Sequence, residues 1–243
     1  MKSRFLLPIV LLGVLPLFPL FAAQQRKSKD DRPLAPTANS LRFDDLVRAD
    51  FFAGMMGDRA RFERAMQLCE TTLAKNPKDV EAMVWHGAGL LVRSEQFMQK
   101  EDFKQSGILF QNGLDEMDQA VAMAPDNPHV LLPQGATLLS VSAASLPPEL
   151  SKRLLQKAVQ DFEKVLKLQA PYFATLPLHA RGELLSGLAD GWHRLGDEIK
   201  SREYNQRIVK ECAGSSYASN SEMWLNNEPL ANRHPACQGC HTK

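Results

Sequence analysis

Residues 61–92 read RFERAMQLCETTLAKNPKDVEAMVWHGAGLLV, and this stretch decides the fold. A group of turn-forming residues, Asn76-Pro77-Lys78-Asp79, divides it into two halves. In each half the apolar and small residues recur every three or four positions, which is the period of an amphipathic α-helix. The stretch therefore predicts two helices joined by a short turn. The pattern is carried before the turn by Phe62, Ala65, Met66, Cys69, Thr72 and Leu73, and after it by Met83, Val84, His86, Gly87, Leu90 and Leu91.

The same arrangement occurs again around a second turn, Ala124-Pro125-Asp126-Asn127. Each turn proline is followed ten residues later by a glycine, Pro77 by Gly87 and Pro125 by Gly135. Proline ends the preceding helix because it lacks a backbone N–H, and a glycine on the next helix lets a neighbour pack closely. No segment alternates apolar and polar residues with the period of a strand. We therefore expect an all-α chain of repeated helix pairs, with a non-repeat helical bundle as the alternative.

This layout resembles the tetratricopeptide repeat (TPR), a helix–turn–helix unit of about 34 residues. Counted back from Pro77, residues 46–79 make one unit of that length. Phe52 and Ala53 then fall on the Leu and Gly positions of the first helix, and Ala65 falls on the small position of the second. The resemblance covers residues 41–225 and implies a TPR-like α-solenoid of about four helix pairs plus a capping helix. In that family the repeats bind other proteins.

The later units depart from the standard length. Residues 80–127 form a unit of 48 residues, and we place its 14 extra residues around 94–105, a polar stretch that joins the two helices. A third unit opens at residue 128 and ends near Ala170-Pro171, and residues 184–211 form a fourth. In the fourth unit Gly196-Asp197 is the expected turn. Residues 216–225 are expected to form the capping helix, and residues 226–243 an irregular tail.

The tail contains the motif Cys237-Gln238-Gly239-Cys240-His241. Cys-x-x-Cys-His is the attachment signature of c-type haem, in which both thiols form thioethers to the porphyrin and the imidazole binds the iron. The motif matches that of cytochromes c residue for residue. This resemblance implies one covalent haem c held by Cys237 and Cys240, with His241 as proximal iron ligand, attachment outside the cytoplasm, and electron transfer. The sixth ligand stays open among Met223, His193, His179 and His234.

Two other interpretations of the tail remain. Only 18 residues follow Leu225, too few to enclose a porphyrin, so a haem would need cover from the last helices or from a partner. The two thiols and the imidazole could instead bind zinc, with Cys212 or His234 as the fourth ligand. The tail could also be incidental to a non-redox scaffold or assembly factor that binds proteins through its repeats.

The N-terminus has the layout of a secretory signal peptide, residues 1–23. Lys2 and Arg4 give a positive charge, residues 5–21 are almost wholly apolar, and Ala22-Ala23 precede an expected cleavage site. An uncleaved N-terminal anchor is the alternative, because about 17 apolar residues are at the lower limit for spanning a bilayer. Residues 24–40 have the composition of a flexible linker. We expect an exported, periplasmic protein, or one tethered to the membrane by this segment.

Composition and motifs narrow the function further. The net charge of +1 and the absence of a basic stripe predict that nucleic acid is not a partner. No Ser–His–Asp arrangement and no glycine-rich phosphate loop occurs, so we expect a protein without enzymatic activity. Cys69 and Cys212 lie in helical patterns and are expected to be small buried hydrophobes. His86 is expected to be a packed histidine rather than a ligand.

Overall fold

The computed structural model describes residues 42–144 and 146–227, which belong to one structural unit, Leu41–Lys243. Within these ranges the chain forms nine α-helices and a short 3-10 helix, and no strand. The predicted signal peptide, the linker and most of the tail lie outside the described residues. The elements are α1 (Phe43–Met55), α2 (Arg59–Lys75), α3 (Val80–Met98), α4 (Phe103–Met123), α5 (Pro128–Val141), α6 (Pro148–Gln169), η1 (Ala170–Thr175), α7 (Leu178–Arg194), α8 (Glu198–Glu211) and α9 (Ser216–Leu225).

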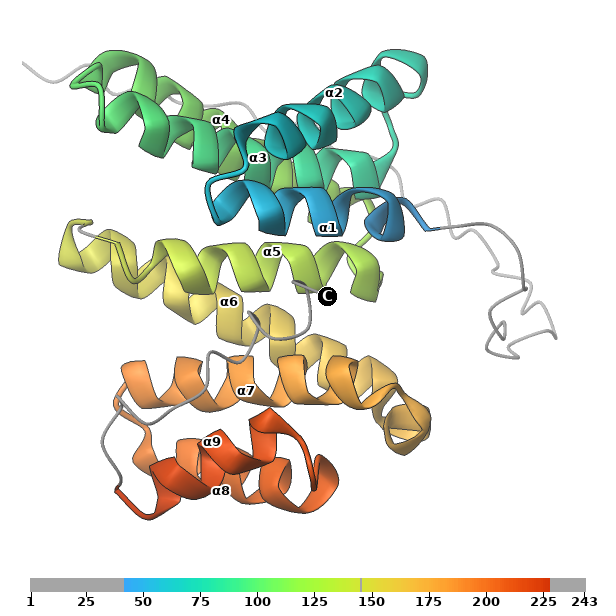
Figure 1. Ribbon diagram of the computed structural model, residues 1–243, viewed down its shortest axis with the longest axis vertical. Helices are drawn as coiled ribbons and strands as arrows, with labels where there is room; N and C mark the ends of the chain where they lie inside the picture. Colours follow the sequence, from blue (N-terminus) through green and yellow to red (C-terminus); the bar gives the residue numbers. More distant parts are fainter. Residues whose placement is uncertain (1–41, 145, 228–243) are drawn as a thin grey trace, which may run out of the picture. The chain divides into compact units, whose positions relative to one another are not determined.

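The helices pack as pairs. Helix α1 packs on α2, α3 on α4, α5 on α6 and α7 on α8, while α9 packs on α8 and α7. Neighbouring pairs meet through α2 and α3, α3 and α5, and α6 and α7. The pairs follow one another in chain order from α1, drawn in blue, to α9, drawn in red (Figure 1). The prediction of an all-α, TPR-like array of four helix pairs with a capping helix is confirmed.

Polar side chains fix where most of the helices begin. The Asp79 carboxylate accepts a hydrogen bond from the Ala82 backbone N–H (3.0 Å), a group that the first turn of a helix leaves unpaired. In the expected turn of the fourth unit, Gly196 takes a positive φ of 85° and Asp197 caps α8. The same device recurs at other helix starts. The capping residues are Asp58, Asp79, Asp102, Asn127, Asp197 and Ser215.

The extra residues of the second unit do not form the polar connection that the sequence suggested around 94–105. They lengthen the helices instead, because α3 runs to Met98 and α4 starts at Phe103. Ser94 is buried within α3, where its hydroxyl donates to the Leu91 carbonyl oxygen (2.8 Å), so its polarity is satisfied inside the helix. Only residues 99–102 connect the pair, and Asp102 caps the second helix.

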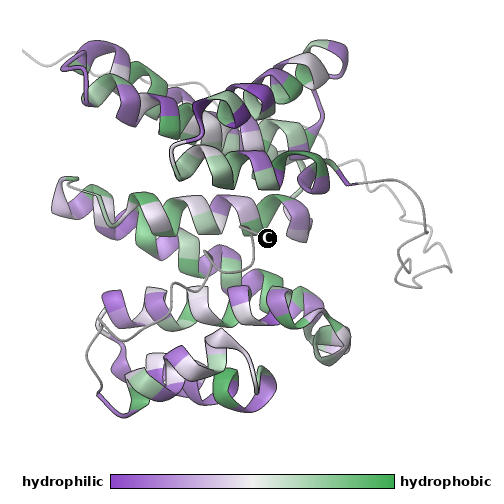
Figure 2. Cartoon of the chain, in the orientation of Figure 1, coloured by the Kyte–Doolittle hydropathy of each residue, from purple (hydrophilic) through white to green (hydrophobic). Residues whose placement is uncertain are grey.

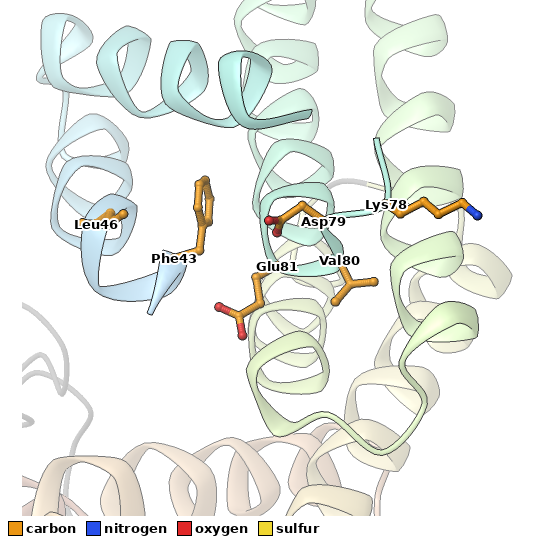
Figure 3. Close-up of a pocket in the computed structure, with 6 residues that line it drawn as sticks. All are labelled: Phe43, Leu46, Lys78, Asp79, Val80 and Glu81. Atoms are coloured by element: carbon orange, nitrogen blue, oxygen red, sulfur yellow. The ribbon is translucent and has the colours of Figure 1, made fainter. Parts of the chain in front are cut away.

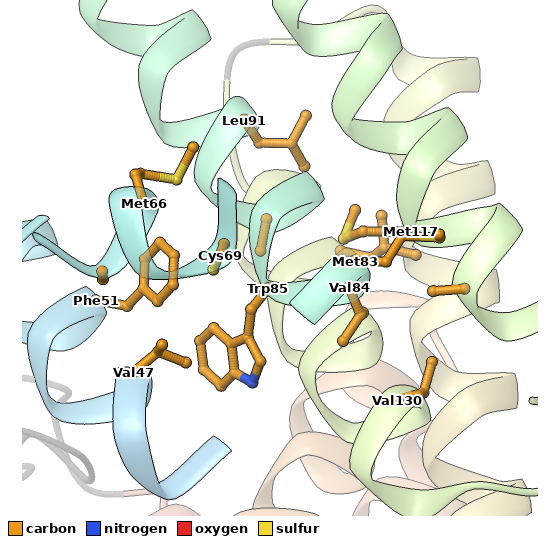
Figure 4. Packing of buried hydrophobic residues seen from close by; sticks show 14 of the residues in the cluster. Val47, Phe51, Met66, Cys69, Met83, Val84, Trp85, Leu91, Met117 and Val130 are labelled. Carbon is orange, nitrogen blue, oxygen red and sulfur yellow. The ribbon is translucent and has the colours of Figure 1, made fainter. Parts of the chain in front are cut away.

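The buried apolar side chains form two clusters that follow each other along the array. The first joins α1 to α4 with parts of α5 and α6, and Phe51, Met66, Trp85 and Met117 lie in it (Figure 4). The second joins α5 to α9 around Phe162 and three leucines of α7. Every helix carries both hydrophobic and hydrophilic residues (Figure 2). Each pair therefore buries its apolar face against its neighbours, as stacked repeats do.

None of the helices in the described ranges combines the length and the hydropathy that crossing a bilayer requires.

Candidate functional site

The structure locates three of the predicted iron ligands. His179 and His193 lie on α7, and Met223 lies on α9. The attachment residues Cys237, Cys240 and His241, together with the candidate His234, lie outside the described residues. The described candidates therefore all lie on α7 and α9.

A cavity of about 220 Å³ lies between α7, α8 and α9. Its lining residues recur at three- and four-residue spacing on α7 and on α9, so each helix presents one face to it. The C-terminal ends of α7 and α9 meet at its rim, where His193 contacts Trp224. The main lining residues are Ser186, Ala189 and His193 on α7 and Tyr217, Ser221 and Trp224 on α9.

His193 is the histidine at the rim of this cavity. Its Nδ1 lies 2.8 Å from Oε1 of Glu198, the first residue of α8. Its ring meets the Trp224 ring edge-on, with the centroids 5.7 Å apart. The side chain is 47% exposed. The Glu198 carboxylate can accept a hydrogen bond from Nδ1–H of this ring.

His179 is held differently. Its Nδ1 lies 2.9 Å from the Tyr217 hydroxyl oxygen, and its Nε2 lies 3.7 Å from Oε2 of Glu183. Nε2 is buried. Glu183 also accepts a hydrogen bond from Arg48 of α1 (3.2 Å), and Arg48 in turn binds the buried Asp44. His179 is therefore part of a polar network that ties α1 to α7 and α9.

The other residues singled out from the sequence that the structure describes are Met223, Cys69 and Cys212. Met223 is partly buried on α9 and does not line the cavity. Cys69 and Cys212 are free thiols with no exposed surface, as predicted. Burial raises the pKa of the Cys69 thiol to about 12, and burial also raises the pKa of Cys212. The described ranges contain no group of three metal-binding side chains.

A second recess, of about 450 Å³, lies where α1 faces the start of α3. Phe43 and Leu46 of α1 and Val80 of α3 are its apolar lining residues. The charged ones are Lys78, Asp79 and Glu81, and the Lys78 side chain extends away from Phe43 and Leu46 (Figure 3). Leu46 is 46% exposed. The sequence did not predict this recess, because its pattern placed Lys78 and Asp79 in a turn and singled out neither Phe43 nor Glu81. The three-residue spacing of Phe43 and Leu46 is the signal that was present.

His86 lies partly buried on α3, as predicted, and its two ring nitrogens face carboxylates of neighbouring helices. Its Nδ1 lies 2.7 Å from Oε2 of Glu116 on α4, and its Nε2 lies 3.9 Å from Oε1 of Glu70 on α2. His86 therefore links three helices and is not a candidate ligand.

The paired helices define the class of the described chain, an all-α helical-repeat scaffold of TPR-like architecture. No family model matches the chain, and no curated protein matches it. Among solved structures, the crystal structure of a thermophilic TPR protein from Thermus thermophilus is similar. The two chains are 15% identical, the alignment covers 76% of this chain and 83% of the other, and the TM-score is 0.49.

Proposed function

We propose that this chain is an exported helical-repeat scaffold with one covalently attached c-type haem on its tail, which exchanges one electron with a protein bound to the repeats. The observation that carries the proposal is the Cys237-Gln238-Gly239-Cys240-His241 motif, which begins 12 residues after the end of α9. Cys237 and Cys240 hold the porphyrin as thioethers and His241 binds the iron. When bound, the haem supplies one-electron redox chemistry.

Two side chains near the ends of α7 and α9, His193 and Trp224, support this proposal. The α7–α9 cavity lies at the end of the helix that leads into the tail, and His193 at its rim offers an imidazole nitrogen of the kind that binds iron. Trp224 adds an apolar ring beside it. Apolar cover around a haem sets its reduction potential and its access to solvent. In this proposal the last helices add to the cover that 18 tail residues cannot supply alone.

The repeat body supplies the protein-binding part of the proposal. The recess between α1 and α3 has three apolar walls and a charged rim, which suits an apolar side chain of a partner flanked by polar groups. No enzymatic reaction, nucleic acid or second cofactor is assigned to the chain.

The test is expression of the full chain with and without the haem-attachment machinery, in wild type and in the Cys237→Ser, Cys240→Ser double variant. The proposal expects a Soret band, a reduced-minus-oxidised difference spectrum and haem staining after denaturing electrophoresis. All three should appear only for wild type made with the machinery. A colourless wild-type protein under those conditions would contradict it.

A non-redox adaptor is the second candidate, and the α1–α3 recess favours it because its lining residues all belong to the repeats. On this account the tail binds no haem or binds zinc. Elemental analysis separates these outcomes: iron equimolar with protein supports the haem carrier, zinc supports a metal-stapled tail, and neither metal leaves the adaptor.

Export is part of the same proposal, with residues 1–23 as the signal. N-terminal sequencing of protein from its native host distinguishes a chain that starts at Gln24 from one that keeps Met1 as a membrane anchor. Recovery of the haem-free chain in the cytoplasm with Met1 retained would contradict export.

A further inference from the structure

We infer that the cavity between α7, α8 and α9 binds the side-chain ammonium of a lysine from a protein held by the repeats. The inference rests on the protein-binding part of the proposed function and names the chemistry of the partner, and it does not require a haem. It is drawn from polar groups of the cavity that no described residue pairs.

Two buried side chains present unpaired polar atoms to the cavity. Asn205 of α8 is 6% exposed, and its amide nitrogen donates to the Ser201 carbonyl oxygen (2.9 Å), which leaves the amide oxygen without a partner among the described residues. Ser221 of α9 is 4% exposed, and its hydroxyl likewise has no partner in the described part of the chain. Both residues line the cavity, and neither belongs to the unpaired side chains whose polar atoms are fully enclosed. Since buried polar atoms are normally paired, the amide oxygen and the hydroxyl point to a ligand in the cavity.

A carboxylate of the cavity selects a cation as that ligand. Asp190 of α7 lines the cavity, and its side chain is 52% exposed. The guanidinium of Arg194 lies 3.4 Å from this carboxylate, but it makes shorter hydrogen bonds to the Leu139 carbonyl oxygen (2.8 Å) and the Ser142 hydroxyl (2.7 Å). The Asp190 carboxylate can therefore accept hydrogen bonds from a further cation.

A lysine side chain fits the number of acceptors and the size of the cavity. Its ammonium has three donors, and each of them needs a partner when the group leaves water. The Asn205 amide oxygen, the Ser221 hydroxyl and the Asp190 carboxylate supply such partners. Ala189 and Ile208 give the cavity buried apolar surface, along which the four-carbon stem of a lysine can pack. The volume of about 220 Å³ equals that of roughly seven water molecules, which is room for one such side chain.

The test is a titration of the full chain with Nα-acetyl-lysine methylamide, followed by the nuclear magnetic resonance signal of the Trp224 indole N–H. Trp224 lines the cavity, and loss of the signal in Trp224→Phe assigns it. The Nε-acetylated form of the same compound keeps the stem without the charge and is the ligand control. We expect saturable shifts with the lysine derivative and at least about tenfold weaker binding of the neutral form, the effect of one lost hydrogen bond to a charged group.

Two variants remove acceptors from the cavity. Asp190→Asn should weaken binding of the lysine derivative about tenfold, and Ser221→Ala about threefold. Ser221→Ala should leave the free energy of unfolding nearly unchanged, because the hydroxyl bonds to no described residue, so its effect on binding is not an effect on folding. Asp115→Asn removes an exposed carboxylate of α4 and is the matched control, which should bind as wild type does. Chemical denaturation of each variant checks its stability.

The absence of a saturable shift, or equal binding of the charged and neutral compounds, overturns the inference. Wild-type affinity in Asp190→Asn overturns it as well. Binding of n-butylamine without binding of the lysine derivative would assign the cavity to a free amine and overturn the assignment to a protein partner. The Cys237→Ser, Cys240→Ser double variant should titrate as wild type does. A colourless protein therefore leaves this inference standing, and a failed titration leaves the haem proposal standing.

Discussion

The backbones of Gly87 on α3 and Gly113 on α4 pack directly against each other. The Gly113 carbonyl oxygen lies 2.8 Å from the position that a Cβ on Gly87 would take, and the Gly87 carbonyl oxygen lies 2.6 Å from the corresponding position on Gly113. No side chain fits at either point. The same holds at Gly135, where a Cβ would lie 2.9 Å from the Phe162 ring. Steric exclusion of a side chain therefore explains why a glycine recurs ten residues after each turn proline.

Replacing Gly87 by Ala should therefore destabilise the protein. The added methyl group would meet the Gly113 carbonyl oxygen and Met117 Cγ, both 2.8 Å away, and the two helices would have to separate. We expect a loss of about 1–3 kcal/mol in the free energy of unfolding, measured by chemical denaturation. Gly107→Ala, on α4, is the matched control, because no atom lies within 4 Å of its Cβ position. It should gain roughly 0.5–1 kcal/mol from helix propensity, and an equal effect at both sites would contradict the packing account.

The link between α1 and α7 gives a second prediction. Arg48→Ala would leave Asp44, which is 4% exposed, and Glu183 without their shared cation. We expect a cost of about 1–3 kcal/mol, the penalty for a buried polar group that loses its partner. Arg42→Ala removes a similar pair with Asp45 at the exposed surface and should cost below about 1 kcal/mol. Thermal unfolding of both variants decides the matter, and equal costs would mean that the α1–α7 link is only a surface contact.

Asp161 on α6 should make stability depend on pH. The residue is 7% exposed, and its Oδ2 has no hydrogen-bond partner among the described residues. Burial raises its pKa from 3.8 to about 7. The Asp118 carboxylate adds to this rise, while the ammonium groups of Lys157 and Lys164 reduce it. Lys157 is itself paired with Asp118. The folded protein therefore binds a proton that the unfolded chain releases as pH rises above 3.8.

The sign follows from linkage. Between about pH 4 and pH 7, Asp161 is ionised in the unfolded chain and protonated in the folded protein. The free energy of unfolding therefore falls by about 1.36 kcal/mol for each pH unit of increase. Asp161→Asn cannot ionise, so its advantage over wild type should grow across this range, to at most about 4 kcal/mol, and level off above about pH 7. Urea denaturation at a series of pH values from about 4 to about 8 measures it. A constant difference at every pH would mean that Asp161 is already ionised in the folded protein.

The buried thiols give a prediction about reactivity. Thiolate is the reactive form, and the Cys69 thiol has no exposed surface and a pKa of about 12. Iodoacetamide should therefore leave Cys69 and Cys212 unmodified in the native protein at about pH 8 and modify both in denaturant. Peptide mass spectrometry reads out each site. Rapid native labelling of Cys69 would show that the contact between α2 and α3 opens readily.

Much of the fold follows from local sequence signals. The prolines and the Asx residues at the turns set the ends of the helices, and the three- and four-residue spacing sets their buried faces. The sequence rules fail where the rest of the protein overrides them. Helix α5 continues through Pro133, which is buried, and the polar stretch around Ser94 joins a helix because its hydroxyl bonds to the preceding turn.

The candidate site was less predictable. The sequence singled out His193 and His179 together, and only the structure separates them, because their partners differ. Glu198 is five residues from His193 and brought near by the turn at Gly196, so that pairing was locally encoded. The partner of Glu183 is Arg48, 135 residues away, and no local pattern specifies such a contact.

The most direct test of the account is the mass of the C-terminal peptide that contains Cys237 and Cys240, taken from protein purified from its native host. The account predicts that this peptide carries one haem, bound through two thioether bonds, with iron equimolar to protein. Two free thiols on that peptide, together with an iron-free protein, would contradict the electron-transfer role and leave a scaffold that only binds other proteins.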